Sequence, residues 1–224
     1  MALKKIKFGT LANDVAHEIR KEIIKGKIKP GQRILENDIS KIMGISRSTL
    51  REAIHQLKSE GVLKVIPYKG TYVNMFNQSD IEQVYEMRVL LETYALEKLI
   101  NKRGNGKTFN DIIEMLDKNI NEMKIAVKKK DLNSFINSDL NFHYNLINNS
   151  SNKFLIQTWE SFITQIKVLL NVEAREYEQF IVSPEEHGEL LCLIKSGKIE
   201  ESKNNLKKHI EKSLSILLKS QSNK

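Results

Sequence analysis

Asp139 and His143 stand four residues apart in the segment Asp-Leu-Asn-Phe-His, a spacing that puts both side chains on one face of a helix. Two more histidines, His187 and His209, follow in segments that also read as helices. Three imidazoles and a carboxylate suit a divalent transition metal such as zinc, nickel or manganese. Spacing alone couples only Asp139 and His143. It leaves open whether the other two histidines join them or are unrelated surface or core residues.

A second group of chemically informative residues is the run SRSTLR at positions 46–51. It follows an amphipathic segment at 35–43 and a turn at Gly44. A helix, a glycine turn and a second helix that begins with Ser, Thr and Arg are typical of a helix-turn-helix. Free amides at a helix N-terminus bind phosphates, and Arg and hydroxyl groups reach base edges. The alternative is that Arg47 and Arg51 are ordinary surface charges.

The charge distribution favours nucleic acid as a partner. Residues 1–75 contain 15 Lys and Arg against 7 Asp and Glu, a net charge of +8, which equals the formal charge of the whole chain. The remaining residues are balanced, with 21 of each sign. Positive charge confined to one segment is the electrostatic footprint of a nucleic-acid-binding domain rather than of a merely basic protein.

The elements that must position this surface form a winged helix-turn-helix over residues 1–75. Hydrophobic periodicity and turn residues predict three helices and a β-hairpin, at 11–25, 35–43, 46–58, 62–66 and 71–73. The hairpin is a wing with Lys69 and Gly70 at its tip, where a cation and a flexible backbone can approach a phosphate or a minor groove.

The rest of the chain reads as helical after a short polar linker at 76–79. Within residues 80–224 we expect helices near 80–101, 108–128, 131–148, 151–177, 184–196 and 199–219. The expected fold is therefore mainly α, a winged helix-turn-helix followed by an all-helical bundle. Arg88 lies on a largely apolar helix. It is either a charge at the solvent edge of that helix, a salt-bridge partner of Glu92, or a group that reaches a pocket and binds a carboxylate ligand.

Composition limits the class of protein. The chain has 224 residues, 40% hydrophobic and 29% charged, which is ordinary for a soluble globular protein. No apolar run approaches the roughly 18 residues needed to span a bilayer, and the basic N-terminus lacks a long apolar core. The single cysteine, Cys192, lies in an apolar run and is expected to be a small core residue. These features favour a cytoplasmic protein with no membrane partner.

The motifs resemble those of the GntR family of bacterial transcription regulators. The segments ISRSTLREAI at 45–54, EGVL at 60–63 and KGTYV at 69–73 are similar to the family's recognition helix and wing. The helical remainder resembles the FCD effector domain of the FadR subfamily. The resemblance implies that Ser46, Arg47, Thr49 and Arg51 contact operator DNA, and that Gly70 is the wing-tip glycine.

For the helical domain, the resemblance implies a metal and an effector. Many FCD domains bind a metal through an Asp-x-x-x-His motif and two later histidines, which Asp139, His143, His187 and His209 match. Arg88 matches a position that can bind a ligand carboxylate. The expected protein is a homodimeric repressor of a palindromic DNA operator that responds to a small carboxylate. The alternatives are a direct metal sensor without an organic effector and, disfavoured because no acid or base stands at a recognisable spacing, a metal-dependent enzyme.

Overall fold

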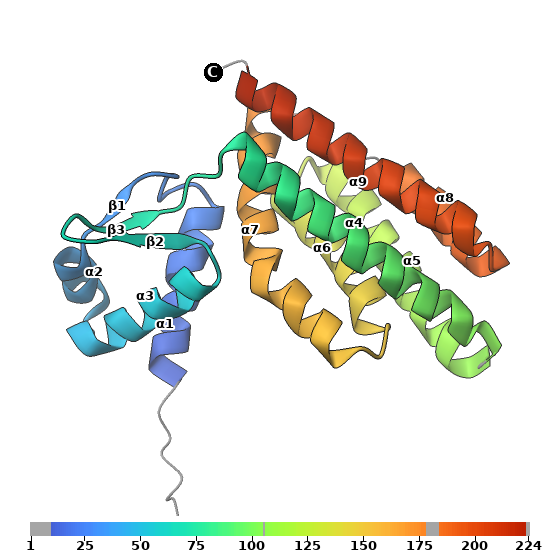
Figure 1. Cartoon of the computed structure of the whole chain (residues 1–224), viewed down its shortest axis with the longest axis horizontal. Coiled ribbons are helices and arrows are strands. Elements are labelled where there is room, and N and C mark those ends of the chain that lie inside the picture. Colours follow the sequence, from blue (N-terminus) through green and yellow to red (C-terminus); the bar gives the residue numbers. More distant parts are fainter. Residues whose placement is uncertain (1–9, 105, 178–183, 223–224) are drawn as a thin grey trace, which may run out of the picture. The chain divides into compact units, whose positions relative to one another are not determined.

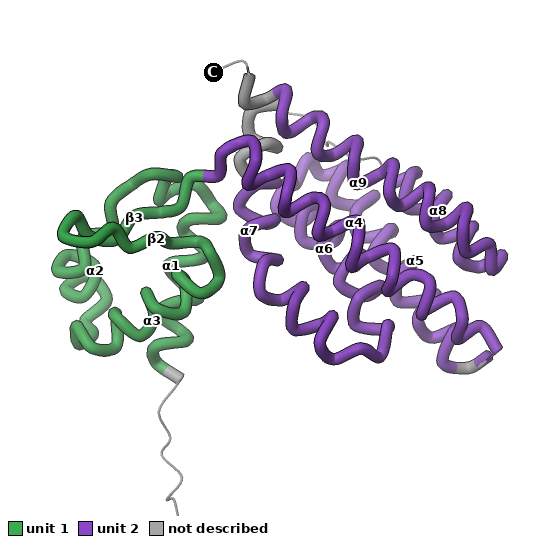
Figure 2. The backbone as a smooth tube through the Cα atoms, in the orientation of Figure 1, with its two compact units in different colours: residues 1–75 green, residues 76–224 purple. Residues whose placement is uncertain are grey.

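The computed structural model describes residues 10–104, 106–177 and 184–222. The chain divides into two compact units, residues 1–75 and 76–224, coloured separately in Figure 2. The basic N-terminal residues 1–9 and Ser183, at one of the expected helix breaks, lie outside the described residues. None of the described helices combines the length and apolar character that crossing a bilayer requires.

The first unit combines helices with a small sheet (Figure 1). Its elements are α1 (Thr10–Ile24), β1 (Arg33–Ile34), α2 (Glu36–Met43), α3 (Arg47–Ser59), β2 (Leu63–Ile66) and β3 (Gly70–Val73). The sheet is antiparallel with strand order β1-β3-β2. Val15 and Ile19 of α1 and Leu50 and Leu57 of α3 are buried, and α1 packs against α3. The β1 strand was not predicted, because its two residues pair with a strand far along the chain.

The turn between α2 and α3 follows from its residues. Gly44 ends α2 with φ 63°, in the left-handed region that favours glycine. Two residues later Ser46 caps α3, and its hydroxyl accepts a hydrogen bond from the Thr49 amide at 3.1 Å. These two local signals fix where α3 starts.

The second unit is an all-helical bundle. It contains α4 (Gln78–Ile100), the 3-10 helix η1 (Asn101–Gly104), α5 (Gly106–Lys129), α6 (Leu132–Asn148), α7 (Lys153–Tyr177), α8 (Pro184–Ser196) and α9 (Ile199–Ser222). Helices α4 and α9 lie side by side, and α6 packs against both α5 and α7 (Figure 1). Phe142 and Trp159 are fully buried in one continuous core. The prediction of a mainly α fold, a winged helix-turn-helix followed by a helical bundle, is confirmed.

The segment between the units is shorter than the predicted linker at 76–79. Asn77 and Asp80 form a capping box, with each side chain bonded to the other's backbone amide at 2.9 Å, so α4 already begins at Gln78. On the other side, the Asn74 amide donates to the Val62 carbonyl at 2.8 Å within the first unit. Phe76 packs on the core of the second unit.

Cys192 corrects one expectation. It is exposed rather than a core residue. Leu190, Leu191 and Ile194 are buried because the helical period of α8 turns them inward, and the same period turns Cys192 outward. An apolar run in the sequence therefore overstated how much of this helix is buried.

Candidate metal centre and DNA-binding surface

The four candidate metal ligands lie close together inside the helical unit, although sequence spacing coupled only two of them. Asp139 and His143 come from α6, His187 from α8 and His209 from α9. All four are buried, and their donor atoms lie within 4.8 Å of one another. The Asp139 Oδ1 lies 3.1 Å from the His187 Nε2 and 3.9 Å from the His143 Nε2. The packing of three helices thus brings the two later histidines to the pair on α6.

The donor set fits a divalent transition metal. Imidazole nitrogens and a carboxylate bind zinc and similar ions at about 2.0–2.2 Å, which needs only a modest approach of the four donors toward a common centre. The His143 Nε2 is buried and has no hydrogen-bond partner among the described residues. A buried polar atom left without a partner costs about 1–3 kcal/mol, and a metal ion would supply the partner.

Two carboxylates contact the histidine rings at Nδ1, the nitrogen opposite the one that would bind a metal. The His143 Nδ1 lies 2.5 Å from the Glu92 Oε2, and the His209 Nδ1 lies 3.3 Å from the Glu186 Oε2. Each contact leaves Nε2 as the ring nitrogen for a metal. Burial outweighs the Glu186 hydrogen bond and lowers the pKa of His209 to about 4, so this imidazole is neutral near pH 7, as a metal ligand must be.

The carboxylate of Asp139 is ionised. Burial by itself would raise its pKa. The hydrogen bond from His187 and the electrostatic interactions with the neighbouring imidazole rings outweigh burial and hold the pKa of Asp139 below its ordinary value. An ionised carboxylate supplies the anionic ligand that a divalent cation needs.

Arg88 is buried beside this centre rather than at a solvent edge. Its Nε donates to the Glu92 Oε1 at 2.9 Å, and the two side chains are 2% and 0% exposed. The guanidinium carbon lies 5.3 Å from the Tyr85 ring centroid and 6.0 Å from that of Trp159. Burial opposes ionisation of Glu92, but its electrostatic interactions and hydrogen bonds with His143 and Arg88 lower its pKa overall. Arg88 thus forms the salt bridge with Glu92 through its Nε. The guanidinium has further N–H donors on its two terminal NH₂ groups.

Sequence reasoning missed two groups near this centre. Glu92 was considered only as a salt-bridge partner of Arg88, because its contact with His143 crosses from α4 to α6. Trp159 on α7 is the second group. Its ring is fully buried, but its Nε1 has no acceptor among the described residues. Neither property has a signal in the sequence, since both depend on how the helices pack.

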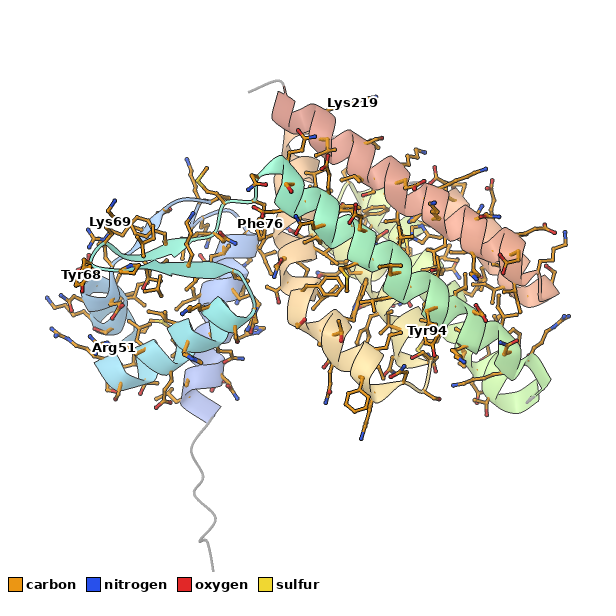
Figure 3. All side chains as sticks on the ribbon, in the orientation of Figure 1. Arg51, Tyr68, Lys69, Phe76, Tyr94 and Lys219 are labelled. Atoms are coloured by element: carbon orange, nitrogen blue, oxygen red, sulfur yellow. The ribbon has the colours of Figure 1, made fainter. Side chains whose placement is uncertain are left out.

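The residues predicted to contact DNA lie on α3 and the wing. Arg47, Arg51 and Lys69 are exposed; Figure 3 labels Arg51 on α3 and Lys69 at the end of the β2–β3 hairpin. Ser46 caps α3, and its hydroxyl lies 2.8 Å from the Thr49 hydroxyl. Ser46, Arg47, Thr49 and Arg51 therefore lie together at the N-terminal end of α3.

The wing is joined to α3 through α2. The Glu36 carboxylate accepts from the Arg51 Nε at 3.3 Å and from the Thr71 hydroxyl at 3.5 Å. At the wing tip Gly70 has φ 109°, and an added Cβ would lie 3.2 Å from the Arg33 Nε, so both conformation and space favour glycine. Glu36 of α2 therefore contacts both α3 and the wing.

The comparisons with known proteins agree with this architecture. A family model described as bacterial regulatory proteins of the gntR family matches residues 11–73, and a model of the FCD domain matches residues 83–212. The gluconate operon transcriptional repressor of Bacillus licheniformis is 29% identical over 171 residues, covering 74% of this chain and 68% of the repressor. The repressor of the same name from Bacillus subtilis is 28% identical over 187 residues, covering 81% and 74%.

Solved structures share the fold. A putative GntR regulator from Rhodococcus sp. RHA1 has a TM-score of 0.77 at 20% identity, covering 92% of this chain and 97% of its own. E. coli McbR/YncC has a TM-score of 0.77 at 20% identity, covering 95% and 99%. The family and these relatives are transcription regulators rather than enzymes. With both family models matched in order along the chain, this protein belongs to the GntR family of bacterial regulatory proteins with an FCD domain, and it is a DNA-binding transcription regulator.

Proposed function

We propose that this regulator is a dimeric repressor whose helical unit binds a divalent transition metal and a small carboxylate effector. The observation that carries the proposal is the convergence of Asp139 and three histidines from α6, α8 and α9 within 4.8 Å, beside the buried Arg88. Zinc, nickel and manganese all suit this donor set. The protein would act in the cytoplasm, where bacterial DNA is found.

The DNA-binding part of the proposal rests on exposed cations. The third helix α3 would enter the major groove with Ser46, Arg47, Thr49 and Arg51, while Lys69 and Gly70 of the wing approach the backbone or the minor groove. Two such units in a dimer read a palindromic operator whose half-sites are about one helical turn apart. Phosphate contacts supply salt-dependent affinity, and base contacts supply sequence preference.

The effector would lie between the metal and Arg88. A carboxylate oxygen and a neighbouring hydroxyl can both bind a metal, while the terminal NH₂ groups of Arg88 bind the carboxylate. The buried Trp159 Nε1 offers one more donor to an oxygen of the ligand. Because two relatives are named as gluconate operon repressors, gluconate and similar sugar acids are the first compounds to test.

A binding experiment tests this function directly. The metal-loaded protein is titrated onto labelled operator DNA by fluorescence anisotropy, with and without each small carboxylate. The effector can release the repressor from DNA only if it binds the DNA-free conformation more tightly than the DNA-bound conformation. Coupling of about 1–3 kcal/mol corresponds to a roughly 5- to 150-fold loss of DNA affinity. Release by metal alone would make the protein a direct metal sensor. Unchanged DNA affinity with every acid and metal would contradict ligand control.

Trp159→Phe separates effector binding from stability. Phenylalanine fills most of the buried space and removes a donor that lacks an acceptor, so we expect the ligand-free variant to unfold within about 1 kcal/mol of wild type. Without the indole hydrogen bond, the effector should bind about tenfold more weakly in the anisotropy assay. An unchanged effector affinity would show that this indole does not contact the ligand.

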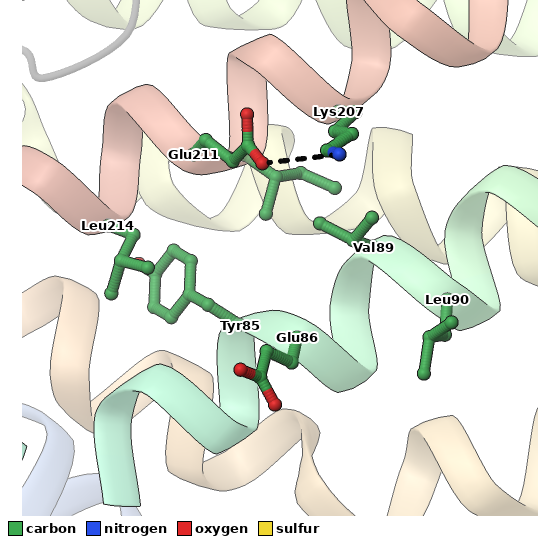
Figure 4. Close-up of a pocket in the computed structure, with 8 residues that line it drawn as sticks. Tyr85, Glu86, Val89, Leu90, Lys207, Glu211 and Leu214 are labelled. Carbon is green, nitrogen blue, oxygen red and sulfur yellow. Dashed lines mark ion pairs between the residues drawn. The ribbon is translucent and has the colours of Figure 1, made fainter. Parts of the chain in front are cut away.

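An apolar stripe on α4 is the surface that we assign to the dimer. Met87, Leu90 and Tyr94 are between 39% and 63% exposed and recur at helical spacing. A groove of about 480 Å³ adjoins them, lined by Tyr85, Glu86, Val89 and Leu90 of α4 and by Lys207, Ile210, Glu211 and Leu214 of α9 (Figure 4). Glu86 and the Lys207–Glu211 ion pair at 3.7 Å place charges of both signs at the groove, and in a two-fold interface the same patch of each subunit faces its copy.

Leu90→Glu is expected to convert the dimer to a monomer. A carboxylate at the centre of an apolar interface stays buried and unpaired, which costs several kcal/mol and raises the dissociation constant at least about 100-fold. Size-exclusion chromatography with light scattering measures the change. The matched control is Ile125→Glu on α5, where the side chain is 52% exposed. A Leu90→Glu protein that remains dimeric would move the interface elsewhere.

A further inference from the structure

Glu92 occupies a buried position between a cation and an imidazole. Its Oε1 accepts from the Arg88 Nε at 2.9 Å, and its Oε2 lies 2.5 Å from the His143 Nδ1. None of the three side chains is more than 2% exposed, so water cannot take the place of any of these contacts. An ionised carboxylate can only accept hydrogen bonds, so the His143 Nδ1 must carry a proton. In the neutral imidazole, the form that binds a metal, the lone pair is then on Nε2, the atom that faces Asp139 at 3.9 Å.

We propose that Glu92 is a positioning residue that fixes the tautomer and ring orientation of His143 for metal binding, with Arg88 as its anchor. The inference rests on the proposed metal centre and deepens it, because Glu92 acts through His143 and does not itself join the four donors. Carboxylates placed behind metal-binding histidines typically change metal affinity 10- to 100-fold.

The other histidine–carboxylate pair gives an internal comparison. Lys212, Glu186 and His209 repeat the order of cation, carboxylate and imidazole. Glu186 is 28% exposed, so water can replace its contact with the ring. The buried Glu92 has no such replacement, and its substitution is expected to weaken metal binding more than Glu186→Gln.

Glu92→Gln is informative because glutamine has a single acceptor oxygen. The Arg88 Nε–H is a donor and cannot turn into an acceptor, so the amide oxygen must face it. The amide NH₂ then faces the His143 Nδ1, which must accept, and the ring proton moves to Nε2. A metal can bind Nε2 only after the proton has returned to Nδ1, where it would face the amide NH₂ instead of an acceptor. We therefore expect the affinity for Zn²⁺ to fall by about 10- to 100-fold, the range typical of carboxylates behind metal-binding histidines.

Arg88→Met in the Glu92→Gln background is the decisive variant. Without the arginine donor, the amide oxygen is free to turn toward His143 and accept from its Nδ1. The double variant should therefore bind the metal more tightly than Glu92→Gln and approach the wild-type affinity, although it carries one more substitution. A purely structural role of Glu92 predicts the opposite, since a second buried change would weaken binding further.

The full-length proteins are compared in two measurements. Competition titrations give Zn²⁺ affinity, with circular dichroism and thermal unfolding to verify the fold. NMR of the histidine ring nitrogens in metal-free protein reads the tautomer, which should be Nδ1–H for His143 in wild type and Nε2–H in Glu92→Gln. The control is Glu97→Gln, also on α4. The Glu97 carboxylate lies 3.1 Å from the Lys203 Nζ and is not one of the groups that contact the four donors. This control should leave both readouts unchanged.

The outcomes separate the two proposals. Glu92→Gln with wild-type tautomer and affinity, or a double variant that binds no better than Glu92→Gln, overturns the role of Glu92. A wild-type protein that does not bind Zn²⁺, nickel or manganese refutes the metal centre. In that case the tautomer of His143 in metal-free protein still decides whether Glu92 orients the ring.

Discussion

Replacing both His143 and His187 with alanine is expected to abolish metal binding by the purified protein. Wild type should contain about one transition metal per chain, and the double variant about none, because two of the four converging donors are removed. Elemental analysis by inductively coupled plasma mass spectrometry measures the content. Metal bound to the folded state at 100 times its dissociation constant stabilises it by about 2.7 kcal/mol, so added metal should raise the Tm of wild type and not that of the variant.

His17→Ala/His55→Ala provides the matched control for this experiment. Both histidines are exposed in the DNA-binding unit, and the double variant removes the same number of imidazoles. It should keep the full metal content. Wild-type protein without metal after purification and reconstitution would contradict the metal centre, as would a His143→Ala/His187→Ala variant that retained its metal.

The second large effect is on DNA. Replacing Arg47 and Arg51 with alanine should weaken operator binding by about 1–3 kcal/mol per side chain, roughly 5- to 150-fold each, because both exposed guanidinium groups lie on the first turns of α3. Where the arginine binds a phosphate, its removal should also reduce the slope of log affinity against log salt concentration by about 1. Fluorescence anisotropy over a range of salt concentrations gives both quantities. The buried face of α3 is untouched, so the fold should persist.

Lys58→Ala removes the same charge from the other end of α3. Lys58 is exposed in the last turn of that helix, away from the capped N-terminus. Its substitution should change operator affinity by less than about twofold if the first turns of α3 face the DNA. Equal losses in the Lys58 and Arg variants would indicate a general effect of charge and would contradict specific contacts by Arg47 and Arg51.

Local signals in the sequence were sufficient for most of the fold. Gly44 and Ser46 placed the turn before the recognition helix, and each has the conformation or hydrogen bond that its residue type favours. Where pairing is not local, the sequence was less informative. The two-residue strand at Arg33–Ile34 exists because β3 offers it partners, and nothing within β1 itself predicts it.

The candidate metal centre illustrates the same limit. The four-residue spacing coupled Asp139 to His143, and only the packing of α8 and α9 against α6 adds His187 and His209. The role that we assign to Glu92 was not predictable from spacing either. Its oxygens face two helices, and a sequence pattern reports only the neighbour on its own helix.

The joint between the units has a consequence for signalling. Asn74 is bonded within the first unit and Phe76 is packed in the second, which leaves Met75 as the residue between the two anchors. Fixing the backbone of one residue costs about 1–2 kcal/mol of conformational entropy. That cost is as large as the coupling of about 1–3 kcal/mol that an effector typically exerts. Under the proposed control by an effector, a ligand that restricted the backbone of Met75 would therefore change the free energy of the protein by about as much as the coupling requires.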